Sequence, residues 1–175
     1  MHEHVRRSAA AAGLHNIETL ECAANDLGAT QPPYDAAICR LGLMLFPSPR
    51  SALEAVQCVL MPGARFAALV FTTPADNAFM AQPMAILLRH SGKSPPQPGQ
   101  PGIFALGGDD GILEQLMKES GLADVKTTKV RALLSLQGAA DALEMMQQAF
   151  GHTARSWPIS VMRKDPEPGA TFMNV

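Results

Sequence analysis

Tyr34-Asp35-Ala36-Ala37-Ile38-Cys39-Arg40-Leu41-Gly42-Leu43, followed downstream by Leu60-Met61-Pro62-Gly63-Ala64-Arg65-Phe66, is the part of the chain that decides the fold. The near-continuous apolar character of residues 36–45 predicts a strand that is buried on both faces, as in parallel sheets. The segment 64–72 is short and nearly uncharged, and this pattern predicts a second strand. The intervening segment therefore connects two strands of a parallel α/β sheet.

That connecting segment has the pattern of an amphipathic helix over residues 49–60. Ser48 is a candidate N-cap, and Pro49 suits the first helical turn, where a missing N–H costs nothing. The apolar side chains recur at helical spacing, whereas Arg50, Glu54 and Gln57 can face water. Pro62-Gly63 is expected to end the helix.

Outward from this centre, composition and turn residues predict a single domain over residues 1–164, with a lid-like insertion at 74–107 and a flexible tail at 165–175. Four further helices are expected: one over 2–12 that ends at Gly13, one around 79–88 that leads into a Pro- and Gly-rich loop at 92–102, one that is capped by Asp109 or Asp110 and ended by Ser120-Gly121, and one at 139–150. Three further strands are expected, at 17–22, 125–133 and 159–162.

Composition excludes several classes of function. The chain has 175 residues, of which 47% are hydrophobic and 17% charged, and its net charge is −2. This balance gives no basic footprint, so we expect no nucleic-acid partner. No uncharged apolar run approaches the roughly 20 residues that span a bilayer, and residues 1–20 lack a signal-peptide core, so we expect no membrane span.

The cysteines indicate neither a disulfide framework nor a metal site. Cys22, Cys39 and Cys58 are isolated and odd in number, which favours small buried side chains in a cytoplasmic protein. His2-Glu3-His4 could hold a metal only in an extended segment, and a frayed helix end is the favoured interpretation. We therefore predict no metal site.

Several of these segments together resemble class I S-adenosylmethionine (SAM) dependent methyltransferases of the ubiquinone and menaquinone biosynthesis type. GLHNIETLECAANDL is similar to the family's third strand and its polar turn, YDAAICRLGLMLF to the fourth strand, VLMPGARFAALVF to the fifth and GLADVKTTKV to the sixth. The resemblance covers residues 5–150 and implies a Rossmann-like, mostly parallel α/β sheet. It implies SAM as the cofactor and a small-molecule acceptor, which apolar residues in the insertion suggest is lipophilic.

The resemblance also implies where SAM would bind. The family holds adenine after the third strand, where the expected acid corresponds to Ala23, so Asn25, Asp26 and Leu27 become the candidate contacts. A turn or helix-capping residue is the favoured interpretation of Asp26, and a nucleotide contact is the alternative. Arg40, Leu41 and Gly42 occupy the position that approaches the methionyl part. Arg40 is either a ligand or a strand-end residue paired with a carboxylate, because an unpaired buried charge is costly.

The family's first strand, glycine-rich cofactor loop and second strand have no counterpart before residue 5, so the resemblance implies weak SAM binding by this chain alone. A family sheet that lacks these strands would be rearranged, with strand 17–22 pairing directly with strand 36–45, or completed by a homodimer.

Other chemical candidates are weaker. His90 follows the helix of the insertion and could act as a general base in an acceptor pocket, although the sequence shows no partner for it. The apolar side chains Met80, Met84, Leu87 and Leu88 fit either an acceptor pocket or core packing. The Gly107–Gly111 run is expected to be a helix-capping turn.

Two functions remain for this sequence. The first is a SAM-dependent methyltransferase domain, or a fragment of one, in which positioning and desolvation supply most of the rate. The alternative is a non-catalytic binding or oligomerisation module derived from a methyltransferase.

Overall fold

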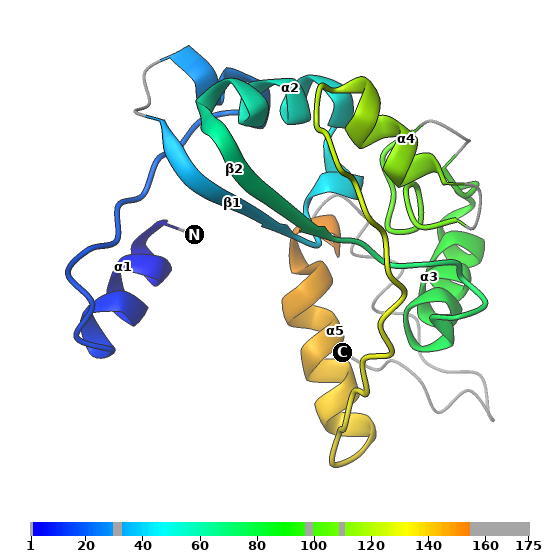
Figure 1. The fold of residues 1–175 in the computed structure, drawn as a ribbon. Coiled ribbons are helices and arrows are strands. Elements are labelled where there is room, and N and C mark those ends of the chain that lie inside the picture. Colours follow the sequence, from blue (N-terminus) through cyan, green and yellow to red (C-terminus); the bar gives the residue numbers. More distant parts are fainter. Residues whose placement is uncertain (1, 30–32, 97–99, 109–110, 155–175) are drawn as a thin grey trace, which may run out of the picture. The chain divides into compact units, whose positions relative to one another are not determined.

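The structure is a computed structural model that describes residues 2–29, 33–96, 100–108 and 111–154. It is a mixed α/β protein with a two-stranded parallel sheet. The chain divides into two compact units, residues 1–73 with 98–127 and residues 74–97 with 128–175. Figure 1 shows the elements of each unit.

Unit 1 is built on the predicted strand–helix–strand segment. Strand β1 is Tyr34–Arg40, helix α2 is Pro49–Val59 and strand β2 is Leu60–Leu69, and β1 and β2 run parallel. A short 3-10 helix, η2 at Leu43–Leu45, leads from β1 into α2. The parallel connection predicted from the sequence is therefore confirmed.

Both ends of α2 follow from local chemistry. The Ser48 side chain accepts a hydrogen bond from the Ser51 backbone N–H at 3.4 Å, so the predicted N-cap is confirmed. The helix ends at Val59, and Pro62-Gly63 lies inside β2, where the register shifts between the Tyr34–Leu60 and Ala36–Arg65 pairs. The predicted helix over 49–60 is confirmed to within one residue, but Pro62-Gly63 lies in the irregular start of the strand and not in a separate turn.

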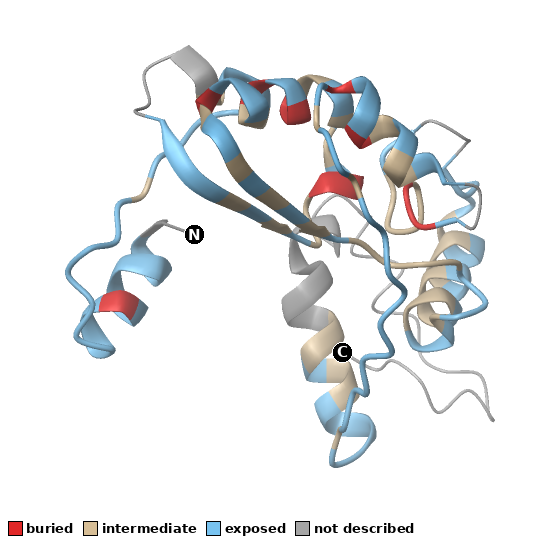
Figure 2. Ribbon diagram, viewed as in Figure 1, coloured by how far each residue is buried: buried red, intermediate tan, exposed pale blue. Residues whose placement is uncertain are grey.

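Alternate residues of the sheet face opposite sides. Cys39, Phe66 and Ala68 are half-buried against the core, whereas Ile38 is 82% exposed on the other side. Figure 2 shows the same alternation of half-buried and exposed residues along the two strands. The expectation that the first strand is buried on both faces was wrong, because the buried core cluster packs against one face and Ile38 stands exposed on the other.

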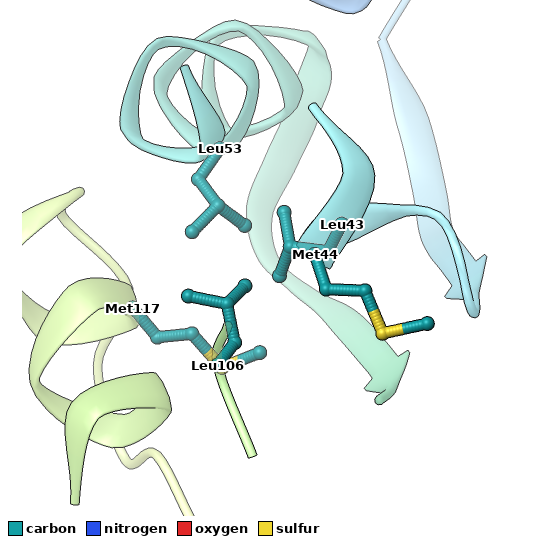
Figure 3. Packing of buried hydrophobic residues seen from close by; sticks show 5 residues of the cluster. All are labelled: Leu43, Met44, Leu53, Leu106 and Met117. Carbon is teal, nitrogen blue, oxygen red and sulfur yellow. The ribbon is translucent and has the colours of Figure 1, made fainter. Parts of the chain in front are cut away.

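The core of unit 1 lies beneath α2. Five buried side chains form it, Leu43, Met44, Leu53, Leu106 and Met117. Figure 3 shows Leu53 of α2, Leu106 and Met117 pointing toward one another from three separate segments. Leu106 belongs to the predicted insertion 74–107, so the end of that segment contributes to the core of unit 1.

Two further elements complete unit 1 on the amino-terminal side. Helix α1 is His2–Ala11, and Gly13 follows it at φ +67°, the conformation predicted for its end. The 3-10 helix η1 at Ala24–Ala29 packs on α2. The predicted strand at 17–22 is not formed, because no strand among the described residues pairs with this segment. Arg6 of α1 donates to the Thr19 hydroxyl at 3.1 Å. The expected direct pairing of this segment with β1 is also not formed.

Helix α4, Ile112–Glu119, ends at Ser120-Gly121 as predicted. Its N-cap position is Gly111, and the predicted caps Asp109 and Asp110 lie outside the described residues. The predicted strand at 125–133 is wrong, because no strand in the described part of the chain pairs with this segment and Val130 is 75% exposed.

Unit 2 contains α3 at Ala78–Ser91 and α5 at Ala139–Ala154, in agreement with the two helices expected there. Gly92 closes α3 at φ +66°. The apolar residues Met80, Met84, Leu87 and Leu88 are half-buried along α3. The predicted strand at 159–162 and the tail at 165–175 lie outside the described residues.

Candidate functional site

The most unusual backbone in unit 1 lies at the carboxyl end of β1. Leu41 adopts φ +57°, a left-handed conformation that branched and bulky residues rarely adopt. Its backbone N–H nevertheless donates to the Leu69 carbonyl at 2.8 Å, which extends the ladder one residue beyond β1. Such outliers persist only where the surrounding structure holds them, and they are concentrated at functional sites.

Gly42 continues this turn. A Cβ at Gly42 would stand 3.2 Å from Cys39 Sγ and 3.8 Å from the Phe46 ring. The Gly42 carbonyl then accepts from Leu45 N–H at 2.8 Å, which starts η2. A side chain at Gly42 would therefore press on Cys39, and the residues that follow it, Leu43 and Met44, are fully buried.

Arg40 is exposed at the end of β1. Within the part of the chain that the structure describes, it forms no ion pair. Of the two interpretations left open for Arg40, pairing with a carboxylate is not seen among the described residues, because Arg40 is exposed on the same face of the sheet as Ile38, and the role as a ligand stays a prediction. Its guanidinium is consequently solvated and free to meet an anionic ligand.

The predicted nucleotide contacts are located elsewhere. Asn25, Asp26 and Leu27 lie on η1, and Asn25 Nδ2 donates to Asp26 Oδ1 at 2.9 Å. Figure 1 shows η1 beside α2, next to the amino end of β1, whereas the turn at Arg40–Gly42 follows its carboxyl end. The structure does not bring these two groups of residues together, so a shared SAM pocket stays a prediction.

His90 lies in unit 2, where it is exposed in the last turn of α3. No hydrogen-bond partner orients its imidazole within the described residues. A role as general base stays a prediction. Among the residues that the structure describes, no group of three or more His, Cys, Asp or Glu side chains could hold a metal ion.

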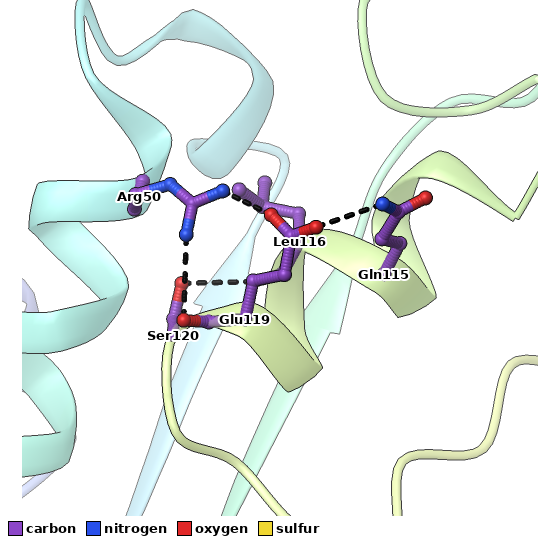
Figure 4. Close-up of polar contacts among 5 residues, drawn as sticks. All are labelled: Arg50, Gln115, Leu116, Glu119 and Ser120. Carbon is purple, nitrogen blue, oxygen red and sulfur yellow. Dashed lines mark hydrogen bonds and ion pairs between the residues drawn. The ribbon is translucent and has the colours of Figure 1, made fainter.

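A shallow hollow on α4 is lined by charged residues, and their charges are matched inside it. Lys118 Nζ donates to Glu114 Oε1 at 2.7 Å, and Gln115 Nε2 donates to Glu119 Oε1 at 2.7 Å. Figure 4 shows Arg50 of α2 reaching both the carboxylate and the backbone carbonyl of Glu119. This cluster ties α2 to α4 and leaves little unsatisfied charge for a ligand.

The carboxylates of that cluster are held in their ionised form. Hydrogen bonds from Gln115 and then Arg50 lower the pKa of Glu119. The hydrogen bond and charge of Lys118 lower the pKa of Glu114. Beneath them, Ser120 is buried and its hydroxyl donates to the Leu116 carbonyl at 2.8 Å.

Sequence reasoning missed two features of unit 1. Gly107 is buried, and an added Cβ would overlap the Phe71 carbonyl oxygen. The Gly107-Gly108 pair signalled a turn but gave no indication of this close backbone approach. The resemblance named Leu41 as a candidate contact, but nothing in the sequence indicated its left-handed conformation, since leucine is ordinary in a strand.

No protein-family model matches this chain, and searches of the curated proteins and of the solved structures also match nothing. In the described residues, no helix has the length and apolar character needed to cross a bilayer.

Proposed function

We propose that this chain is a SAM-dependent methyltransferase domain, or a fragment of one, that transfers a methyl group to a small, lipophilic acceptor in the cytoplasm. Bound SAM supplies an electrophilic methyl group on a sulfonium, and the protein's task is to bind, orient and exclude water. The proposal includes a Rossmann-like sheet with more strands than the two that the structure describes.

The observation that carries it is the turn at the carboxyl end of a parallel strand–helix–strand unit. In open parallel α/β sheets, ligands bind outside the carboxyl ends of the strands. In this chain Leu41 holds φ +57° at that position, directly after the exposed Arg40. A left-handed residue and a cation that forms no ion pair with the described residues therefore stand where a ligand is expected.

The residues of this turn fit only part of SAM. The Arg40 guanidinium suits a carboxylate, because its fork of N–H donors can bind both oxygens. That assigns Arg40 to the methionyl carboxylate. The η1 residues Asn25, Asp26 and Leu27 do not join the turn in this structure, so the adenine contact rests on the family resemblance alone.

Calorimetric titration of the full chain tests the proposal. We expect S-adenosylhomocysteine to bind and Arg40→Gln to weaken it about tenfold, since a hydrogen bond to a charged group contributes about 1.5–3 kcal/mol. Methylthioadenosine lacks the carboxylate, so its affinity should not change in Arg40→Gln. Arg65→Gln is the matched control, because Arg65 is also exposed on the sheet but precedes the carboxyl end of β2. No heat and no thermal shift with millimolar ligand would exclude the enzyme.

The open face of the sheet favours a second candidate, a non-catalytic binding or oligomerisation module. Ile38 is 82% exposed and Leu69 is 50% exposed on that side. Scattered apolar side chains are common on protein surfaces, but neighbouring ones on an open sheet are typical of contact surfaces. This candidate predicts association without SAM binding.

A further inference from the structure

Residues 128–136 of unit 2, which connect toward α5, expose a group of large apolar side chains. Leu133 is 85% exposed, Val130 is 75% exposed and Leu134 is 54% exposed, so three such side chains face water within five residues. This exposed segment forms neither helix nor strand, and Figure 2 shows it exposed along most of its length. Single apolar side chains are common on protein surfaces, but a contiguous group is typical of a contact surface.

The exposed segment is also positively charged. It holds Lys129 and Arg131, Lys126 precedes it, and it contains no Asp or Glu. The nearest acidic residues along the chain are Asp124 before it and Asp141 after it. Cations without intervening acids are unusual in a chain whose net charge is −2. A partner that fits this segment must therefore supply both negative charge and an apolar environment.

We propose that the exposed segment binds the surface of a membrane that contains anionic lipids. Such a surface offers negatively charged headgroups to Lys129 and Arg131, and the boundary of its acyl layer to Leu133 and Leu134. Lipid headgroups can rearrange around the two cations, whereas a protein partner would need acids and an apolar pocket at fixed positions. The interaction does not depend on SAM binding.

The segment is expected to lie among the headgroups and not within the hydrocarbon. Backbone N–H and C=O groups outside helices and closed barrels would lose their hydrogen bonds to water in the acyl layer, and this loss is costly. The side chains of Val130, Leu133 and Leu134 can reach the acyl boundary while the backbone stays hydrated. The affinity then has two contributions, apolar burial and attraction to anionic lipid, and salt screens the second.

Co-sedimentation of the full chain with lipid vesicles tests the proposal. We expect binding to vesicles of equal parts phosphatidylcholine and phosphatidylglycerol, and much weaker binding to phosphatidylcholine alone or at high ionic strength. Arg131→Gln should lower the affinity for the anionic vesicles about fivefold, which corresponds to the attraction of one cation to such a surface.

Leu133→Glu tests the apolar contribution. It removes an exposed apolar side chain and adds a negative charge, so it should abolish binding to the anionic vesicles. Ile38→Glu is the matched control, because Ile38 is 82% exposed on the open face of the sheet in unit 1. This control should bind the vesicles like the wild type. Circular dichroism checks that each variant is folded, and Arg131→Gln decides if Leu133→Glu is not.

A wild-type chain that does not sediment with the anionic vesicles would overturn the proposal. So would equal binding to neutral and anionic vesicles, or an equal loss of binding in Ile38→Glu. Gel filtration distinguishes a protein contact from a lipid contact. An oligomer that dissociates in folded Leu133→Glu would assign the exposed segment to a second copy of the chain and would also overturn the proposal.

Discussion

The backbone N–H of Leu41 donates to the Leu69 carbonyl at 2.8 Å while Leu41 itself holds φ +57°. The ladder between the two strands thus extends into a residue whose conformation is unfavourable for leucine. A left-handed conformation costs roughly 1–2 kcal/mol for a residue other than glycine. The parallel pair and the packing of η2 must supply that free energy.

Leu41→Gly and Leu41→Ala measure this strain. Both remove the half-buried leucine side chain, but only alanine retains the penalty of a Cβ at positive φ. We expect the glycine variant to be more stable than the alanine variant by about 1 kcal/mol. Urea unfolding measures the difference, and an alanine variant of equal or greater stability would show that Leu41 is unstrained.

Gly107→Ala should destabilise unit 1 strongly. Its Cβ would overlap the Phe71 carbonyl oxygen, so the backbone of one segment must move, and we expect a loss of about 2 kcal/mol or more. Gly138→Ala is the matched control, because its Cβ would meet nothing within 4 Å. Thermal unfolding of the two variants tests the close approach, which would be refuted by equal melting temperatures.

Leu53→Ala tests whether α2 holds the core. Leu53 is 0% exposed, and truncating such a residue typically lowers the free energy of unfolding by about 2–5 kcal/mol. Leu45→Ala, at a position that is 53% exposed, should cost much less. Denaturant titration compares them, and a similar loss in both variants would place the core elsewhere.

Glu119 should give stability that depends on pH. Its folded pKa lies below the usual value of 4.5, because Gln115 and Arg50 donate hydrogen bonds to the carboxylate. A lowered pKa stabilises the fold above the unfolded pKa, and this contribution is lost as the pH falls through the folded value. Glu119→Gln should therefore be less stable than the wild type at pH 7 and approach it in acid. The measurement is the urea midpoint of both proteins from neutral to acidic pH, and a constant difference would contradict the assignment.

The sequence predicted local structure well where the signals were local. Ser48-Pro49 located the start of α2, and Gly13, Gly92 and Gly121 each follow a helix with positive φ. The apolar runs around Ile38 and Phe66 predicted two parallel strands. Each of these signals depends on the chemistry of a few neighbouring residues, so the sequence is sufficient to locate them.

Pairing between distant segments was harder to predict. Residues 17–22 and 125–133 have the alternation of strands, but a strand also needs a neighbour whose backbone groups are free. The prediction that β1 is buried on both faces failed for a similar reason. An apolar residue such as Ile38 does not reveal from the sequence whether another layer of the protein covers it. At the candidate site, the family resemblance named Arg40, Leu41 and Gly42, but the left-handed conformation of Leu41 depends on tertiary packing.

The central claim is that the turn following β1 binds the methionyl part of SAM, and amide chemical-shift mapping tests it directly. The full chain is labelled with ¹⁵N and titrated with S-adenosylhomocysteine. We expect saturable shifts in the amides of Arg40, Leu41 and Gly42, and their loss in Arg40→Gln. Spectra that stay unchanged at these residues with millimolar ligand, or shifts that are confined to other segments, would contradict it.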